Sequence, residues 1–389
     1  MTGFRPILLM SLSQAFVWAS IFYLFPALLL SWEADMGWSR AEVAGAISVA
    51  IVLSGLGAPL AGRLIDSGHS HLLMVGASFV AAGGLLILMT AHSLAQFYLA
   101  WAIIGLAMAG TLYEPCFAIV TRSKGPQAKQ AITAITLIAG FASAISFPVT
   151  IGLADAYGWR VSVALAAFVC AFVVAPLNYF GVRAFEPDET VTTNAAEQRH
   201  GHLKHQAFWF LALGFTFLAF VHGATFNHLL PYLDELEVTP GMAVAIAAAF
   251  GPMQVSGRLV MALLGNRVSS HGFTIAAFLL MGGAVAVLNV GQGSNASLIA
   301  FIVIYGGSYG TVSILRPVMA RIILGGDNFG AKTGALALPY LAGIALSPYV
   351  AALIWSGWGY SVVFTLMSLM AAIGCVLYAL SYQFRQSKS

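Results

Sequence analysis

Residues 72–92 read LLMVGASFVAAGGLLILMTAH, a run of 21 residues without Asp, Glu, Lys or Arg. An α-helix rises about 1.5 Å per residue, so about 20 residues cross the ~30 Å hydrocarbon core of a bilayer. A backbone amide without a partner costs several kcal/mol in hydrocarbon, and a helix pairs its amides within one segment. This stretch therefore predicts one transmembrane helix.

The same pattern recurs along the whole chain. Of the 389 residues only 8% are charged and 60% are hydrophobic, whereas soluble domains carry about 25% charged residues. We therefore expect an all-α membrane protein with twelve transmembrane helices, the first of them an uncleaved span. The predicted spans lie near 7–31, 41–62, 72–92, 96–121, 130–154, 160–182, 205–233, 240–265, 271–291, 296–322, 331–355 and 359–384.

The distribution of Lys and Arg predicts the orientation. With a cytoplasmic N-terminus, thirteen of these residues fall in cytoplasmic segments, and only Arg40 and Arg160 lie on the opposite side. Positive charge marks the cytoplasmic side, so we expect a multi-pass protein of the cell (inner) membrane with both termini cytoplasmic. The net charge of +3 reflects this bias and gives no reason to expect nucleic-acid binding. The thirteen residues are Arg5, Arg63, Arg122, Lys124, Lys129, Arg183, Arg199, Lys204, Arg267, Arg321, Lys332, Arg385 and Lys388.

A polar stretch separates the sixth predicted span from the seventh. It divides the chain into an N-terminal six-helix bundle (1–182), a flexible cytoplasmic linker (183–204) and a C-terminal six-helix bundle (205–389). A metal site at His200, His202 and His205 is conceivable, but we interpret these histidines as part of a solvated linker. We expect no metal and no cofactor.

The two predicted bundles echo each other. Residue pairs separated by 199 to 205 positions recur in the same order along the two halves, which indicates a tandem repeat. The pairs are Pro26 and Pro231, Ser54-Gly55 and Ser256-Gly257, Gly110-Thr111 and Gly310-Thr311, Glu114-Pro115 and Arg316-Pro317, and Trp159 and Trp358.

Six plus six spans around a central linker resemble the major facilitator superfamily. The signature loop of that family, roughly Gly-x-x-x-Asp-Arg-x-Gly, is matched here by Gly62 and Asp66, while Ser67 replaces the arginine and Gly68 falls one place early. The resemblance implies two pseudo-symmetric bundles that bind a substrate near the midplane between them. It also implies that Gly62 and Asp66 belong to a gating hinge, with Asp66 expected near a helix N-terminus, where its charge is favoured.

Two further features resemble the monocarboxylate and oxalate–formate branch of the superfamily. One is Gly37-Trp38-Ser39-Arg40 before the second span, and the other is Arg258 in the eighth span. In that branch such an arginine holds the substrate carboxylate, often with an acid one turn earlier, where this chain has Gln254. The Gly-Pro-x-x-Gly-Gly motif that drug antiporters carry in the fifth span does not occur.

Three charged residues lie deep inside predicted spans: Glu114, Arg258 and Arg316. Each costs at least about 2.5 kcal/mol to insert, so such residues are paired or face water or a substrate. We predict that Arg258 and Arg316 form a cationic site, with Glu114 as a partner or proton carrier. The alternative is that Glu114 and Arg316 neutralise each other and hold the two bundles together. Two cations against one acid leave a positive charge that an anion would neutralise.

Other candidate site residues follow from the resemblance, since the first and seventh spans line the cavity in this superfamily. It implies that Tyr23, Asn227 and His228 contact the substrate, and Tyr113, beside Glu114, is a further candidate. A lone histidine in a span often serves only as a hydrogen bond between helices. That alternative stays open for His228 and is preferred for His222.

These features predict a secondary active transporter that moves a small organic anion of the carboxylate type by alternating access. We expect a monomer in the lipid bilayer, with protons or a counter-anion as its coupling partner. The alternatives are a proton-driven efflux pump for a neutral or amphipathic compound and a carrier for a larger aromatic nutrient. An intramembrane protease would need a Ser–His pair or a His-Glu-x-x-His helix, and a phosphatase would need clustered acids. With one acid inside the spans, we do not expect an enzyme.

Overall fold

The computed structural model describes residues 4–124, 128–185, 205–264, 267–325 and 329–385, and all regular structure in these ranges is helical. The chain divides into two compact units, Met1–Thr193 and Asn194–Ser389. Residues 186–204 of the predicted linker lie outside the described residues, as do Gly265, Asn266 and Asp327.

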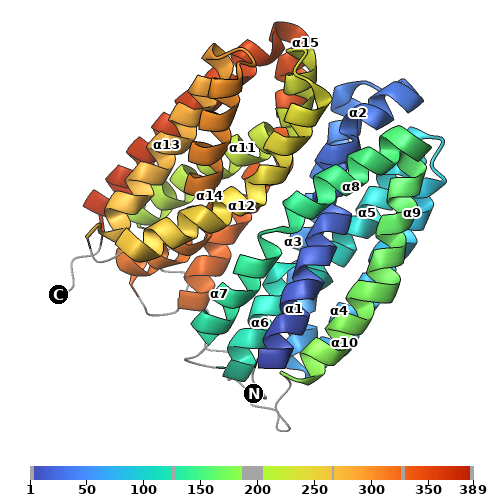
Figure 1. The fold of residues 1–389 in the computed structure, drawn as a ribbon. Coiled ribbons are helices and arrows are strands. Elements are labelled where there is room, and N and C mark those ends of the chain that lie inside the picture. Colours follow the sequence, from blue (N-terminus) through green and yellow to red (C-terminus); the bar gives the residue numbers. More distant parts are fainter. Residues whose placement is uncertain (1–3, 125–127, 186–204, 265–266, 326–328, 386–389) are drawn as a thin grey trace. The chain divides into compact units, whose positions relative to one another are not determined.

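Unit 1 is a helical bundle in which four spans change geometry on the way across (Figure 1). The first and sixth spans each contain one π-helical turn, η1 and η3. The fourth span is split into α5 and α6, and the fifth is split into α7 and α8. The elements are α1 (Phe4–Val17), η1 (Trp18–Phe22), α2 (Leu24–Met36), α3 (Arg40–Asp66), α4 (Ser70–Met89), α5 (Leu94–Thr111), α6 (Tyr113–Lys124), α7 (Ala128–Ala139), α8 (Ala142–Tyr157), α9 (Trp159–Val169), η3 (Cys170–Val174) and α10 (Ala175–Arg183).

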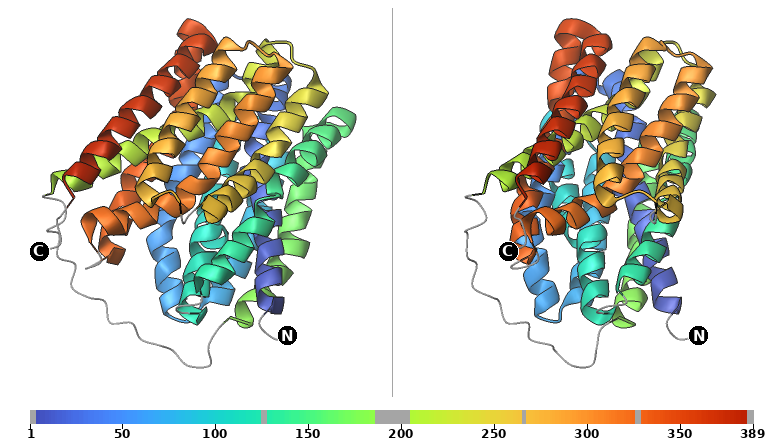
Figure 2. Two further views of the ribbon diagram at one scale, coloured as in Figure 1. Left: turned by 60° about the vertical axis from the view of Figure 1, so that its left-hand side comes forward. Right: turned by 90° about the vertical axis from the view of Figure 1, so that its left-hand side faces the viewer.

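Unit 2 is built from longer continuous helices. They are α11 (Gln206–Glu235), α12 (Pro240–Leu264), α13 (Ser270–Val290), α14 (Asn295–Leu324) and α15 (Phe329–Gln383). The 55 residues of α15 include a break at Gly359, whose φ of 76° and ψ of 173° are not helical. The orange and red parts of this segment are separate helices in Figure 2.

The break at Gly359 reconciles the number of spans. Eleven helical stretches of the described residues are long and apolar enough to cross a membrane, and the last of them covers 50 residues, Gly334–Gln383. At 1.5 Å per residue such a stretch is about 75 Å long, more than twice the hydrocarbon thickness. Divided at Gly359 it provides two spans, which confirms the predicted all-α fold with twelve transmembrane helices.

Serine side chains mark where several helices begin. The Ser39 hydroxyl accepts a bond from the Glu42 amide while the Glu42 carboxylate accepts from the Ser39 amide, which is a capping box. Ser93, Ser269 and Ser294 cap α5, α13 and α14 in the simpler one-sided way. These caps satisfy amides that the first turn of a helix leaves without partners.

Glycine allows the closest helix contacts, and the same spans use it in both units. In unit 1, a Cβ on Gly105 of α5 would lie 2.3 Å from the Ala50 carbonyl oxygen of α3. In unit 2, a Cβ on Gly257 of α12 would lie 1.8 Å from the Gly307 oxygen, and one on Gly310 of α14 would lie 2.2 Å from the Gln254 oxygen. Small residues let membrane helices approach in this way. The second and fourth spans of unit 1 thus pack as the eighth and tenth do in unit 2.

We expect Gly257→Ala to lower the stability of unit 2, because its methyl group would meet backbone atoms of α14 that cannot rotate away. Overpacking of this kind costs about 1–3 kcal/mol. The measurement is the thermal melting temperature of the detergent-purified protein. Gly283→Ala in α13 is the matched control, since nothing lies within 4 Å of its Cβ position. Equal melting temperatures for the two variants would contradict the close contact.

Candidate functional site

The fourth span is interrupted directly before Tyr113. Leu112 has an extended backbone, with φ of −78° and ψ of −161°, so α5 ends at Thr111 and α6 begins at Tyr113. The Gln14 side-chain amide donates to the Thr111 carbonyl at 2.9 Å and so satisfies one group at the break. Non-helical backbone at membrane depth is tolerated only inside protein or beside a water-filled cavity. Such breaks are typical of transporter binding sites.

Glu114 lies in the first turn of α6, and its side chain is exposed. Hydropathy gives the depth of a residue in a span but not the helix face that carries it, so the role of Glu114 as a partner or proton carrier stays a prediction. An acidic residue in the first turn is favoured by the helix dipole. Whether Glu114 pairs with Arg316 of the other unit stays a prediction.

Aromatic rings gather next to Glu114 in unit 1. The Trp18 ring centroid lies 4.8 Å from that of Tyr113 and 6.2 Å from that of Tyr23, and Tyr23 contacts Phe147 at 6.0 Å. Trp18 opens the π-helical turn η1, and such turns are frequent at functional sites because they re-aim side chains. The two predicted site residues Tyr23 and Tyr113 thus share one cluster through Trp18, a residue that the sequence analysis did not select.

A buried polar network lies deeper in unit 1 and was also not predicted. The Asn178 amide group donates to the Ser78 hydroxyl at 3.0 Å and the Thr111 hydroxyl at 3.3 Å, while its oxygen accepts from Ser13 at 2.5 Å. All four side chains are fully buried. The network joins the first, third, fourth and sixth spans beside the break at Leu112, so it holds the end of α5 in place.

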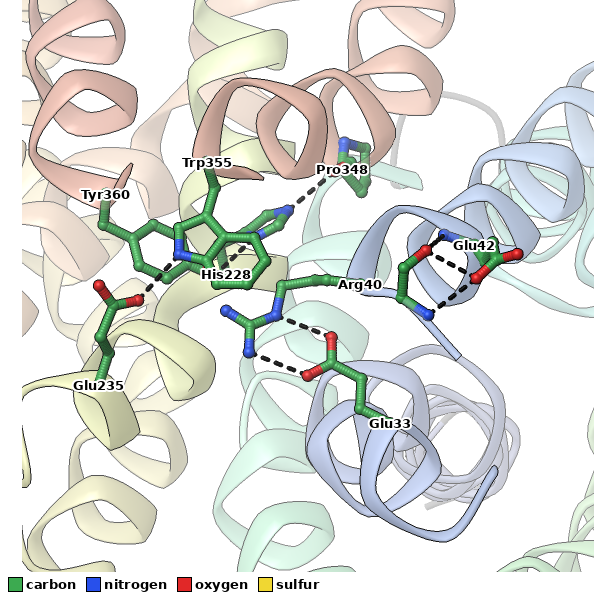
Figure 3. Close-up of polar contacts among 9 residues, drawn as sticks. Glu33, Arg40, Glu42, His228, Glu235, Pro348, Trp355 and Tyr360 are labelled. Atoms are coloured by element: carbon green, nitrogen blue, oxygen red, sulfur yellow. Dashed lines mark hydrogen bonds and ion pairs between the residues drawn. The ribbon is translucent and has the colours of Figure 1, made fainter. Parts of the chain in front are cut away.

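The segment that resembles the monocarboxylate branch forms a turn with its own ion pair (Figure 3). Gly37 has a φ of 69°, and Arg40 makes two bonds to Glu33, at 2.7 and 2.9 Å. Arg160, the other positive residue predicted on that side, bonds to Asp35 at 2.8 Å. Both outer arginines are therefore paired with acids inside unit 1.

The predicted gating loop has a local structural explanation for its irregular sequence. Gly68 has a φ of 80°, the His69 amide donates to Leu64, and the Gly68 amide donates to Ile65. This is a Schellman motif, which needs glycine one residue after the helix cap. Asp66 is the last residue of α3, so the expected placement at a helix N-terminus is wrong.

A basic residue instead completes the end of α3. Arg122, in the last turn of α6, donates from Nη1 to the Ile65 carbonyl. Positive charge is favoured at a helix C-terminus. Gly62 has nothing within 4 Å of its Cβ position, so its predicted role in gating receives no steric explanation.

Arg316 lies in α14 with its guanidinium carbon 3.9 Å from the centre of the Tyr340 ring. No acid belongs to the sequences of α12, α13, α14 or α15, and the acids in the described part of unit 2 are Asp234, Glu235 and Glu237 at the end of α11. A cation over an aromatic face is attracted to it but keeps its charge. Arg316 is thus held in place without being neutralised within the described part of its own unit.

Arg258 joins α12 to α14 at the glycine contact. Its Nε donates to the Gly310 carbonyl at 3.0 Å, and the side chain is half-buried. Gly310 lies six residues before Arg316 on the same helix. Arg316 is a residue of α14, and Arg258 of α12 is hydrogen-bonded to a main-chain carbonyl of α14. Both arginines of the predicted cationic site are therefore held at this helix.

His228 is fully buried and uses both ring nitrogens (Figure 3). Nε2 lies 2.8 Å from the Pro348 carbonyl and Nδ1 lies 2.9 Å from the Tyr360 hydroxyl. A carbonyl can only accept, so Nε2 carries a proton, and in the neutral ring Nδ1 accepts from tyrosine. Asn227, the neighbouring candidate, donates to Gly223 of its own helix at 2.9 Å. Of the two interpretations of His228, these contacts favour the hydrogen bond between helices.

We expect His228→Phe to lower the melting temperature, because it leaves the Tyr360 hydroxyl and the Pro348 carbonyl without this partner. Each unsatisfied buried group costs about 1–3 kcal/mol. Tyr360→Phe is the matched variant and should cost less, since it removes one bond and leaves Pro348 bonded. If His228→Phe melts like the wild type but loses transport, His228 contacts the substrate instead.

His222 differs from His228 although both lie on α11. Its side chain is 6% exposed, its Nδ1 has no hydrogen-bond partner among the described residues, and its ring stacks on Tyr309 with centroids 3.4 Å apart. Tyr309 in turn lies close enough to Tyr340 and Arg316 to interact with both electrostatically. The hydrogen bond between helices that is expected for His222 does not form at Nδ1 with any of the described residues.

Comparison with known proteins places this geometry in a family. The profile of the Major Facilitator Superfamily matches residues 10–322. The chain belongs to the major facilitator superfamily. A relative, the "MFS transporter asaE" of Aspergillus flavus, is 24% identical over 312 residues, which cover 77% of this chain and 68% of the relative.

Solved structures of other superfamily members share the fold at low sequence identity. A bacterial homologue of the human lysosomal transporter Spinster superposes with a TM-score of 0.77 at 14% identity, over 98% of each chain. The nucleoside transporter NupG gives 0.77 at 11% identity, over 98% of this chain and all of its own. The human organic anion transporter MFSD10 (TETRAN) gives 0.67 at 18% identity, over 96% of this chain and 98% of its own.

Proposed function

We propose that this major facilitator is a secondary active transporter for a small organic anion of the carboxylate type, which it moves by alternating access. The observation that carries the proposal is Arg316, a guanidinium in the middle of α14 that lies on the Tyr340 ring without an acid of the described part of its own unit beside it. Inserting such a charge costs at least about 2.5 kcal/mol, which a substrate anion would offset.

The chemistry of the side chain favours a carboxylate. A guanidinium stays charged at any physiological pH and presents a planar fork that fits the two oxygens of a carboxylate. Stacking on Tyr340 fixes the plane of that fork before a substrate arrives, so less side-chain entropy is lost on binding. A neutral substrate would leave the charge of Arg316 uncompensated.

Arg258 supports the same proposal in a second role. Its bond to the Gly310 carbonyl anchors it to the helix that carries Arg316 and adds a second positive charge to that region of unit 2. Together with Gly37-Trp38-Ser39-Arg40, it is the feature for which the chain resembles the monocarboxylate and oxalate–formate branch. The organic anion transporter among the structural neighbours shares the fold at 18% identity.

We further propose that protons or a counter-anion drive the cycle, in a monomer of the cell (inner) membrane with cytoplasmic termini. The bias of Lys and Arg toward one side supports the orientation. The aromatic cluster of Tyr23, Tyr113 and Trp18 would contact the apolar part of the substrate. The second candidate is a proton-driven efflux pump for a neutral or amphipathic compound, favoured by the exposed Glu114 beside that cluster.

We expect Arg316→Gln to abolish uptake of a labelled carboxylate into proteoliposomes, and Arg316→Lys to weaken it strongly because the fork is lost. Arg321→Gln is the matched control, since Arg321 is an exposed arginine in the last turn of the same helix. Both variants of Arg316 should still insert and melt cooperatively. Normal carboxylate uptake by Arg316→Gln would refute the anion site.

The pairing of Glu114 with Arg316 is tested by a double-mutant cycle. If the two charges meet during transport or folding, Glu114→Gln and Arg316→Gln should each reduce the yield of folded protein, and the double variant should recover it. The coupling energy between contacting residues is typically about 0.5–3 kcal/mol. Additive losses would mean that the residues are not partners, which leaves Arg316 to the substrate.

A further inference from the structure

The contacts of His222 suggest a role that the sequence did not assign. It is the buried histidine of α11 whose Nδ1 finds no partner among the described residues. A polar atom that is buried without a partner costs about 1–3 kcal/mol. Packing alone would be served better by an apolar ring at this position, since Phe226 and Phe250 already lie 5.6 and 5.7 Å away.

The groups around His222 form a short chain that ends at Arg316. From α14, Tyr305 and Tyr309 stack against its ring at 6.3 and 3.4 Å. From α15, Tyr340 interacts with both tyrosines and carries Arg316 on its face. We define these five residues, His222, Tyr305, Tyr309, Tyr340 and Arg316, as the relay cluster.

Two other ionisable side chains of α11 and α12 are engaged in hydrogen bonds. On α12, Phe250 contacts the ring, while Arg258 is bonded to the Gly310 carbonyl. On α11 itself, His228 is bonded to Pro348 and Tyr360. None of α12, α13, α14 and α15 carries an acid in its sequence. Within the described part of unit 2, a positive charge on His222 would therefore face neutral aromatic rings and the positive Arg316.

We propose that His222 is the proton carrier of the transport cycle and that anion binding at Arg316 controls its protonation. Without the anion, the charge of Arg316 repels a proton on His222. When a carboxylate neutralises Arg316, the lone pair of Nδ1 takes a proton from hydronium of the aqueous solution, so that an N–H bond forms as an O–H bond of hydronium breaks. Release of the anion restores the repulsion and expels the proton on the other side. This inference rests on the proposed function and names the residue that couples it to protons.

Linkage makes the coupling reciprocal, so the anion must bind more tightly when His222 is protonated and the proton more tightly when the anion is bound. Couplings of this kind typically change affinity by about 5- to 150-fold. Anion binding to the wild-type protein should therefore take up protons from a weakly buffered solution. L-lactate and oxalate are the probes, and a pH indicator records the uptake. Binding without proton uptake would overturn the proposal.

The variants His222→Gln and His222→Phe test the residue in proteoliposomes that contain the full chain. His222→Phe keeps an aromatic ring against Tyr309. With a more acidic outside, the wild type should accumulate labelled lactate or oxalate. Accumulation by both variants should be at least about fivefold lower than that of the wild type, which is the lower end of typical coupling. Anion exchange at equal pH should persist in both. His271→Gln is the matched control, because His271 also stacks on a tyrosine, Tyr382, at 3.7 Å but lies outside the relay cluster.

The outcomes separate the two proposals. If His222→Gln or His222→Phe accumulates anion as the wild type does, His222 is not the carrier. If both variants lose exchange together with accumulation, His222 serves anion binding rather than coupling. Anion exchange by a wild type that ignores the pH gradient would overturn the coupling and leave the anion transporter standing. A wild type that moves neither anion would refute the proposed function itself.

Discussion

The need to satisfy every backbone polar group inside hydrocarbon governs this chain. Most of the described residues meet it with continuous helix, and at several departures from regular helix a side chain supplies a missing partner. Gln14 serves the Thr111 carbonyl at the break in the fourth span. Pro348 has no amide to offer the Ile344 carbonyl, which accepts from the Ser347 hydroxyl at 2.9 Å. The loop after α3 is closed by Gly68 and by Arg122 from a distant helix.

The same constraint explains how two halves with one ancestral pattern carry different chemistry. Glu114-Pro115 and Arg316-Pro317 occupy equivalent positions, yet the chain breaks before the first pair and stays helical through the second. In unit 1 the break gives the acid the favourable first turn of a helix. In unit 2 the arginine stays in the helix interior and rests on Tyr340. The repeat fixes where the charges lie, and the local backbone decides how each one is accommodated.

Sequence patterns predicted the spans closely, because hydropathy and span length are read directly from the residues. The most visible difference is that α15 covers two of the predicted spans. The break at Gly359 divides it into those two spans. The arginines could be found because a charge is conspicuous in an apolar run. Their partners could not, since Tyr340 is one of 13 tyrosines in a chain with 26 phenylalanines. Asn178 and Trp18 likewise gain their meaning from residues on other spans. The exposure of Glu114 could not be read from the sequence, because the helix face depends on packing.

His222 and His228 show how far the function depends on such packing. They are six residues apart on one helix, which places them about 120° apart around its axis. One therefore reaches Pro348 and Tyr360 and is fully bonded, while the other reaches Tyr309 and keeps a ring nitrogen without a partner among the described residues. The first can hold helices together but has no free capacity for a proton or a ligand. The second stands beside the neighbours of Arg316, and α12, α13, α14 and α15 carry no acid in their sequences. Under the proposed function, the compensating negative charge comes with the substrate anion.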